Sequence, residues 1–169
     1  MGKIYCGINR EEFKQLENLN PTKLKEISEK GKNILLYTSQ SKTEKILEII
    51  NSTEHQNLLF WYCTKALKLS LDQCLYKSAK FLIEDLNIDI NHEEFQFIVH
   101  KYIWKMKENC KMITEDSDHS LILKLLLTRI NDINEMDSIL YSTSLHIACK
   151  ILCFPFIKIL VGFINREWI

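Results

Sequence analysis

The stretch that decides the fold is Thr143–Val161, which reads TSLHIACKILCFPFIKILV. Apolar residues recur at helical spacing on both sides of a short break, which predicts two helices joined by a turn. Thr143 suits the start of the first helix, because its hydroxyl can accept a hydrogen bond from a free backbone N–H. Pro155 suits the first turn of the second helix, where its missing N–H costs nothing. The stretch therefore predicts a helix–turn–helix unit.

Residues 143–161 resemble the ankyrin repeat, whose pattern T-P-L-H-x-A-A-x-x-G-H-x-x-I-V-x-L-L-L they follow without a gap. The identical matches are Thr143, Leu145, His146, Ala148 and Leu160. The matches in kind are Cys149, Phe156, Ile157, Ile159 and Val161. The resemblance implies a solenoid in which stacked helix pairs cover each other's apolar faces. It also implies a structural role for His146, not a catalytic one.

The same pattern fits three other segments. In Asn33–Asn51 the matching residues are Leu35, Thr38, Ser39, Ile46, Leu47, Ile49 and Ile50. In Lys65–Ile83 they are Leu67, Ser70, Ala79, Phe81, Leu82 and Ile83. In the remaining copy only the second helix matches, through Ile122, Leu123, Leu125, Leu126 and Leu127. Its first helix, expected at Glu93–Cys110, is longer than the family's. The tripeptide Asp-Ile-Asn, at residues 89–91 and again at 132–134, resembles the turn that begins an ankyrin finger.

The turn between the two helices of a repeat carries glycine in the family, and this chain departs from that pattern. Lys42, Cys74 and Leu152 stand at the position, so we expect longer or reshaped turns. A glycine does occur upstream at Gly31, where we expect it to end a helix that starts with Asn20 as its cap and Pro21 at its first position. That helix and an earlier one are expected to form an N-terminal cap.

We therefore expect an all-α chain, an ankyrin-like helix–turn–helix solenoid behind an N-terminal helical cap. The cap is expected at residues 1–32. About four divergent repeats are expected at residues 33–64, 65–91, 92–134 and 135–169. The composition favours this class, because the 169 residues include only four glycines and two prolines.

Charge and composition exclude several classes of function. Twenty-two basic residues balance 22 acidic ones, which argues against a nucleic-acid-binding protein and suggests that binding depends on shape more than on long-range attraction. The apolar C-terminal stretch carries Lys150, Pro155 and Lys158, which disfavours a membrane span. No signal segment follows the start, so we expect an intracellular, cytoplasmic protein with mostly buried thiols.

No standard motif for catalysis or cofactor binding is present, so we expect no enzyme activity and no cofactor. His146, Cys149 and Cys153 lie close in sequence, but no second ligand pair stands at zinc-site spacing, so we expect no metal. Phe60, Trp61 and Tyr62 are too wide a cluster for one buried face. We expect at least two of these three side chains to pack in the core.

The expected function is that of a non-catalytic scaffold that presents a concave repeat surface to a protein partner. The expected contact residues lie on the finger at Asn134–Ser142, with one aromatic anchor on an earlier helix. They are Glu135, Met136, Asp137, Ser138, Tyr141 and Trp61. Two alternatives remain open at this point. One is a structural fragment of a longer array, or a chain that self-associates through its apolar end at Phe163, Ile164, Trp168 and Ile169; the other is an enzyme with an unrecognised site.

Overall fold

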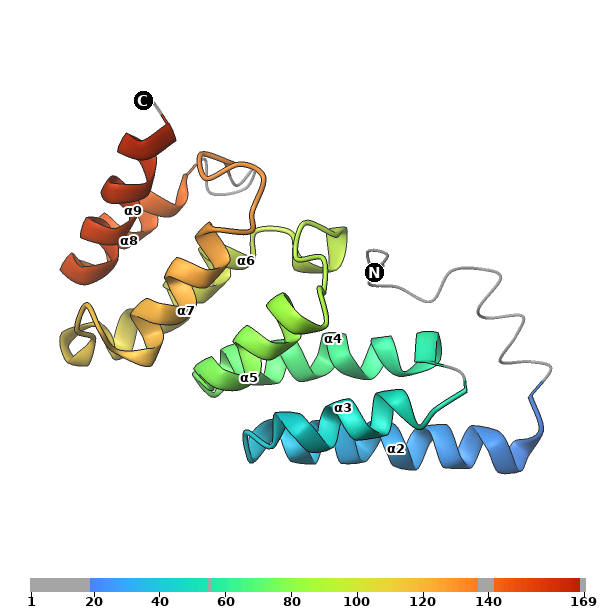
Figure 1. The fold of residues 1–169 in the computed structure, drawn as a ribbon. Helices are drawn as coiled ribbons and strands as arrows, with labels where there is room; N and C mark the ends of the chain where they lie inside the picture. Colours follow the sequence, from blue (N-terminus) through green and yellow to red (C-terminus); the bar gives the residue numbers. More distant parts are fainter. Residues whose placement is uncertain (1–18, 55, 137–141, 168–169) are drawn as a thin grey trace. The chain divides into compact units, whose positions relative to one another are not determined.

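The computed structural model of the chain describes residues 19–54, 56–136 and 142–167. Within these ranges the chain forms helices and no β-strand, which confirms the all-α class. The helices gather into two compact units (Figure 1). Unit 1 ends at Glu94, and unit 2 begins at Phe95.

Unit 1 consists of two helix pairs. Its helices are α2 (Pro21–Ser39), α3 (Thr43–Asn51), α4 (Gln56–Asp72) and α5 (Tyr76–Lys80), the last of which continues as a π-helical turn, η1 (Phe81–Asp85). In each pair the second helix runs back along the first, and α2 packs along α4. Ile46 and Ile50 of α3 are buried as expected, but Leu47 is 41% exposed. Leu47 follows Ile46 by one residue, a rotation of about 100° around the helix, which turns it away from the core.

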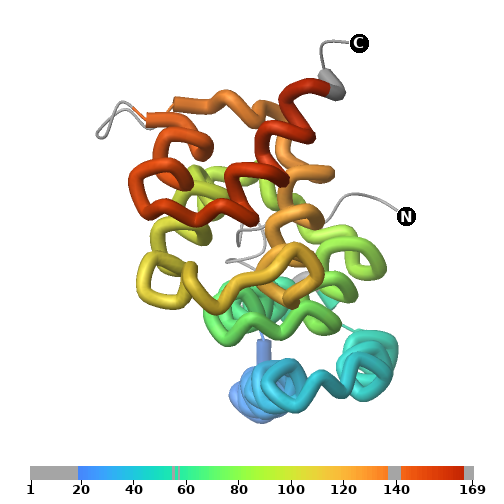
Figure 2. The backbone as a smooth tube through the Cα atoms, turned by 90° about the vertical axis from the view of Figure 1, so that its left-hand side faces the viewer, coloured from blue at the N-terminus to red at the C-terminus, as the bar shows by residue number. Residues whose placement is uncertain are grey.

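Unit 2 also consists of two helix pairs. Its helices are α6 (Ile98–Lys105), α7 (Asp118–Leu127), α8 (Ser144–Lys150) and α9 (Phe154–Glu167). The first helices of the pairs, α6 and α8, pack together, and so do the second helices, α7 and α9. Figure 2 shows this stacking from the side. Neighbouring pairs within a unit thus cover each other's apolar faces, whereas an ankyrin-type solenoid over the whole chain stays a prediction.

The helix α2 corrects one expectation about the N-terminal region. Asn20 does cap it, since its side-chain Oδ1 accepts a 3.0 Å hydrogen bond from the Thr22 N–H, and Pro21 is its first residue. Gly31 does not end it, because the helix continues to Ser39 with Gly31 buried inside. The boundary expected between residues 32 and 33 therefore falls within α2. The boundary expected between residues 64 and 65 falls within α4.

Three inter-helix turns share one tight geometry, so the expectation of longer or reshaped turns is wrong. Ser41, Cys74 and Leu152 have left-handed φ values of 53°, 57° and 56°. The residue after each of them donates its N–H to a carbonyl five residues back, as in Lys42 N to Tyr37 O at 2.9 Å. This is the Schellman ending of a helix, made here without glycine. In the first turn the left-handed residue is Ser41, not Lys42, which has a φ of −93°.

The two Asp-Ile-Asn tripeptides form the same local turn, although they lie in different units. The Asp89 carboxylate accepts a 3.0 Å hydrogen bond from the Asn91 N–H, and the Asp132 carboxylate accepts one of 2.8 Å from the Asn134 N–H. The central isoleucines are buried in both turns. Each tripeptide therefore closes its own loop with a polar side chain and anchors it with an apolar one.

The segment before α7 is less regular than expected. One long helix at Glu93–Cys110 is wrong, because Phe97 adopts a left-handed φ of 57° and separates a 3-10 turn, η2 (Glu93–Phe95), from α6. Two further 3-10 turns follow α6, namely η3 (Met106–Glu108) and η4 (Cys110–Met112). The residues expected on its buried face are all buried, namely Phe95, Ile98, Val99, Tyr102 and Met106. The apolar pattern specifies which side chains are buried but not the backbone bend between them.

The stretch at residues 143–161 folds as its sequence predicts. Thr143 is the N-cap of α8, and Pro155 is the second residue of α9. His146 has the expected structural position: its Nδ1 accepts a 3.3 Å hydrogen bond from the Thr143 N–H and lies 2.9 Å from the Thr143 hydroxyl. These contacts tie the imidazole to the first turn of α8.

Candidate functional site

The expected finger contacts are described only in part. Glu135 and Met136 are exposed, Met136 to 56%, so both side chains are accessible from solvent. Asp137, Ser138 and Tyr141 lie outside the described residues. Of the expected contact residues on the finger, Glu135 and Met136 are therefore the two that the structure describes, and both are accessible.

The expected aromatic anchor, Trp61, lies on α4 of unit 1. It is 37% exposed, and the Lys65 ammonium stands over its ring, 3.4 Å from the ring centroid. Its neighbour Tyr62 contacts it edge-on, with ring centroids 4.9 Å apart. Phe60 and Tyr62 are partly buried, and the Tyr62 ring packs against Gly31 of α2. The indole of Trp61 is already covered on one face by Lys65.

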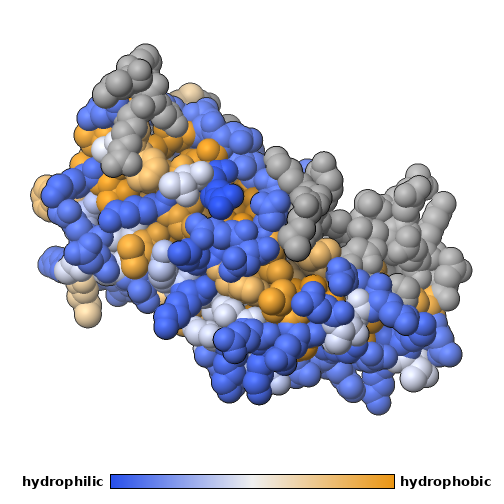
Figure 3. Space-filling model, viewed as in Figure 1, coloured by the Kyte–Doolittle hydropathy of each residue, from blue (hydrophilic) through white to orange (hydrophobic). Residues whose placement is uncertain are grey.

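A larger exposed apolar surface lies on unit 2, where the sequence interpretation placed no contact residue. We call it the Trp104 surface, and its members are Trp104, Lys107, Lys111, Met112, Lys150, Leu152 and Phe154. Met112 is 82% exposed, Leu152 69% and Phe154 73%. In Figure 3, pale orange side chains stand out from the left-hand edge of unit 2 beyond the blue surface around them. Large apolar side chains grouped in this way on a surface are typical of interaction sites.

Trp104 contacts two lysines of this surface. Its ring is 43% exposed, and two ammonium groups lie near it, Lys107 Nζ at 5.7 Å and Lys150 Nζ at 5.5 Å from the ring centroid. Both distances are within the range of a cation–π interaction. Lys107 follows α6 and Lys150 ends α8, so the indole contacts a lysine from each of the two helix pairs of unit 2.

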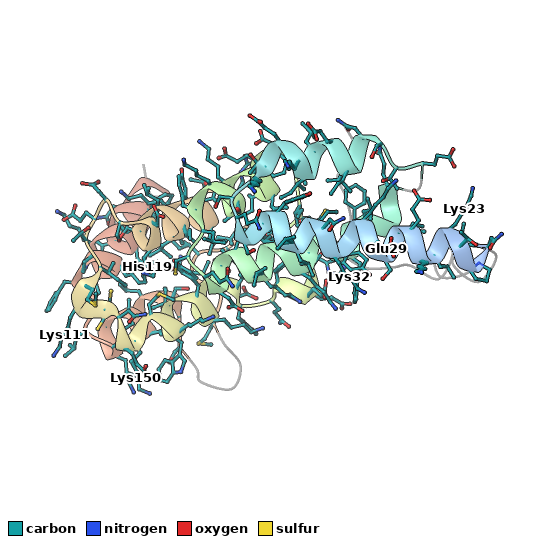
Figure 4. The ribbon with its side chains drawn as sticks, turned by 90° about the horizontal axis from the view of Figure 1, so that it is seen from below. Lys23, Glu29, Lys32, Lys111, His119 and Lys150 are labelled. Carbon is teal, nitrogen blue, oxygen red and sulfur yellow. The ribbon has the colours of Figure 1, made fainter. Side chains whose placement is uncertain are left out.

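The remaining members lie on or next to two turns that pack against each other. Cys110 Sγ of η4 donates to the Ile151 carbonyl oxygen at 3.5 Å, which places η4 beside the α8–α9 turn. Figures 1 and 2 agree on this proximity. Met112 therefore lies on the same side of unit 2 as Leu152 and Phe154. Figure 4 shows Lys111 and Lys150 at this same end of the unit.

Buried contacts hold the helices under the surface in place. The rings of Tyr102 on α6 and Phe156 on α9 stack with centroids 6.2 Å apart. His100 of α6 is buried, and its Nε2 lies 3.1 Å from the Ser142 carbonyl oxygen. A carbonyl can only accept, so Nε2 carries the proton and Nδ1 accepts from the Ser144 hydroxyl at 3.4 Å. This histidine, to which the sequence interpretation gave no role, links α6 to the start of α8.

The Trp104 surface is locally basic although the chain is neutral. Residues 101–112 contain four lysines and one acidic residue, Glu108. All four lysines are exposed, as is Lys150. The zero net charge of the chain therefore does not describe this surface.

Two ionisable groups of unit 2 have pKa values that differ from the ordinary ones. Burial lowers the pKa of the His119 imidazole, and the Asp118 carboxylate opposes this effect. Burial also raises the pKa of the Cys153 thiol, against a hydrogen bond from the Phe156 backbone, and the nearby Cys110 adds to the rise. Among the five described cysteines, Cys63 and Cys153 are buried, Cys74 and Cys110 are partly buried, and Cys149 is exposed, so the expectation of mostly buried thiols is wrong.

Unit 1 carries a shallow cavity that is a weaker candidate. Its volume is about 270 Å³, and it lies between α2 and the α3–α4 turn, lined by Lys23, Glu26, Ile27, Lys30, Ser52, Thr53 and Glu54. Its charges neutralise each other, since Lys30 pairs with Glu26 at 2.8 Å and Lys23 with Glu54 at 3.6 Å. Figure 4 shows Lys23 on α2 together with Glu29 and Lys32. The cavity therefore offers little unpaired charge to a ligand.

The described residues contain no group of three or more His, Cys, Asp or Glu side chains placed to hold a metal ion. None of the described helices is long and apolar enough to cross a membrane. In comparisons with models of protein families, with curated proteins and with solved structures, the chain matched none of them. The candidate site therefore rests on its own geometry.

Part of the Trp104 surface has a signal in the sequence. The stretch KYIWKMKENCKM, residues 101–112, contains four lysines and one tryptophan. Those on α6 lie on the side opposite its buried residues. Such a stripe indicates a solvated face with an aromatic anchor. The contribution of Lys150, Leu152 and Phe154 has no such signal, because these residues lie about forty positions downstream and reach the surface only through packing.

Proposed function

We propose that this chain is a non-catalytic protein-binding module of ankyrin-like helix pairs, and that the Trp104 surface is its main binding site. The partner is a protein, not a nucleic acid or a membrane, and the location is intracellular. Stacked helix pairs serve as the rigid support, and turns and short loops carry the contacts.

The observation that carries this proposal is the exposure of Met112, Leu152 and Phe154 in a unit where Lys150, two residues before Leu152, lies over the Trp104 ring. Full burial of one such side chain contributes about 1.5–3 kcal/mol of free energy, so the burial of several of them by a partner favours a stable complex. Tryptophan and other large apolar side chains are typical of the residues that contribute most to binding at interfaces, and here lysines lie among them.

The proposal is tested by comparing what three forms of the full chain capture from the source cell. The forms are the wild type, Trp104→Ala with Phe154→Ala, and a control with Leu36→Ala and Leu47→Ala. The control removes two exposed apolar residues of unit 1, 50% and 41% exposed, and leaves unit 2 unchanged. Circular dichroism and thermal unfolding verify that all three forms fold.

We expect a protein that the wild type and the control capture and that the Trp104/Phe154 variant loses. A fourth form, Glu135→Ala with Met136→Ala, distinguishes the finger from the Trp104 surface. If only the finger variant loses the partner, the site is the finger. If no protein distinguishes the wild type from the variants, the binding function itself is refuted.

Self-association is the second candidate, because Val161 on α9, the last described helix, is 40% exposed and Ile164 is only partly buried. Light scattering after size exclusion measures the molar mass directly. A dimer that Val161→Lys converts to a monomer supports it, and a monomeric wild type rejects it.

A further inference from the structure

We propose that the Trp104 surface binds an acidic segment of the partner protein in which carboxylates alternate with apolar side chains. This inference rests on the proposed function and specifies the chemistry of the partner. Its basis is the way cations and apolar groups are mixed on this one surface.

Several lysines described elsewhere pair with carboxylates, whereas the lysines of the Trp104 surface pair with none of the described ones. Lys23, Lys30, Lys68, Lys80 and Lys158 each stand within salt-bridge distance of a carboxylate. Within the described part of the chain, no carboxylate pairs with Lys107, Lys111 or Lys150. Glu108 is the neighbouring acidic side chain, and it is exposed. Three ammonium groups are thus available to an incoming anion.

The cations are interleaved with the apolar groups, not set apart from them. Lys107 and Lys150 both lie within 6 Å of the Trp104 ring centroid. In the sequence, Lys111 directly precedes Met112, and Lys150 stands two residues before Leu152. A polypeptide that alternates Glu or Asp with Leu or Phe offers both carboxylates and apolar side chains to such a surface. Charge complementarity and apolar burial then act on one contact.

Two other anionic partners fit less well. A single-stranded nucleic acid would stack its bases on Trp104 and Phe154, but it would leave Met112 and Leu152 without matching apolar contacts, and the surface offers only lysines for phosphate contacts. A lipid surface would place apolar side chains deepest and cations around them at the headgroups, whereas here the cations flank the Trp104 indole. The interleaved arrangement therefore favours an acidic protein segment.

The test uses a short fluorescein-labelled peptide of Glu, Leu and Phe and measures its binding to the full chain by fluorescence anisotropy. Companion peptides replace every Glu by Gln, or every Leu and Phe by Ala. The protein variants are Lys107→Gln with Lys111→Gln and Lys150→Gln, and a control with Lys25→Gln, Lys32→Gln and Lys77→Gln. The control removes the same charge from exposed lysines of unit 1.

We expect the acidic apolar peptide to bind the wild type and the control alike, and the Lys107/Lys111/Lys150 variant more weakly by a factor between about 3 and about 100, the range for three exposed ion pairs. Both companion peptides bind more weakly than the parent, and added salt weakens the parent's binding. A Gln peptide that binds as tightly as the Glu peptide, a triple variant with unchanged affinity, or no peptide binding overturns the inference.

Vesicles of phosphatidylcholine with phosphatidylserine form the lipid arm. The wild type and the Lys107/Lys111/Lys150 variant are sedimented with these vesicles. If the wild type sediments with them, the variant does not, and no peptide binds, the surface is a lipid-binding site and the inference is overturned. The proposed function fails separately, by the capture experiment. A captured partner that depends on Trp104 and Phe154 but has no acidic segment keeps the function and rejects this inference.

Discussion

Gly31 lies in the middle of α2 with the ring of Tyr62 directly against it, so that a Cβ at position 31 would overlap Cγ, Cδ2 and Cε2 of that ring. Tyr62 is on α4, and its hydroxyl donates to the Ser28 hydroxyl at 3.4 Å. The glycine thus allows two stacked helices of unit 1 to approach closely. Its role is close packing, not the ending of a helix.

We predict that Gly31→Ala lowers the free energy of unfolding by about 1–3 kcal/mol, because the Tyr62 ring must move away. In an exposed helix the same substitution stabilises by about 1 kcal/mol. Urea denaturation of Gly31→Ala, Tyr62→Ala and the double variant measures the coupling. In the Tyr62→Ala background Gly31→Ala should become stabilising; additive effects of the two substitutions would contradict the contact.

Leu152→Gly is predicted to stabilise the chain by about 1 kcal/mol, because Leu152 has a left-handed φ that costs L-residues energy. Its side chain is 69% exposed, so little packing is lost. Leu152→Ala is the matched control, since it removes the side chain and keeps the strain. Thermal unfolding should rank Gly above both Leu and Ala, and equal stability of Gly and Ala would reject the strain.

Stability is predicted to fall as the pH is lowered below about 6.5 because of His119, whose pKa is lowered by burial. The unfolded chain then binds a proton more readily than the folded one, so stability is present above the ordinary pKa and is lost as the pH falls towards the folded value. Urea denaturation at pH 7.5 and 5.5 measures this. His119→Gln should reduce the difference between the two pH values, and an unchanged difference would assign it to other groups.

His100→Ala is predicted to cost about 1–3 kcal/mol, because it leaves the Ser142 carbonyl and the Ser144 hydroxyl without their imidazole partner. His92→Ala, at a partly exposed position, is the control and should cost much less. Chemical denaturation of both variants measures the difference. Equal, small effects would mean that the link between α6 and α8 contributes little.

Several local features could be predicted from the sequence because short-range rules decide them. Asn20 and Pro21 begin α2, Thr143 begins α8, and the two Asp-Ile-Asn turns close on themselves. Each of these depends on residues within four positions in the chain. The apolar spacing likewise identified most of the buried faces.

Features that depend on distant residues could not be predicted in the same way. Gly31 is typical of a helix end until Tyr62, thirty-one residues later, is known to fill the space beside it. Lys42 was aligned to the family's glycine, yet the helix end falls one residue earlier, at Ser41. The bend at Phe97 separates the buried Phe95 from the buried residues of α6, and the apolar periodicity does not encode it.

The candidate site shows the same division. The sequence alone determined an all-α chain with helix–turn–helix units, because apolar periodicity, caps and turn residues act within a few positions. Only the tertiary structure brought Lys150 to Trp104 and the turn at Ile151 to Cys110, through the packing of α8 beside α6. A surface is made of residues that are neighbours in space. Their neighbourhood depends on how buried faces fit together, and no local pattern records that fit.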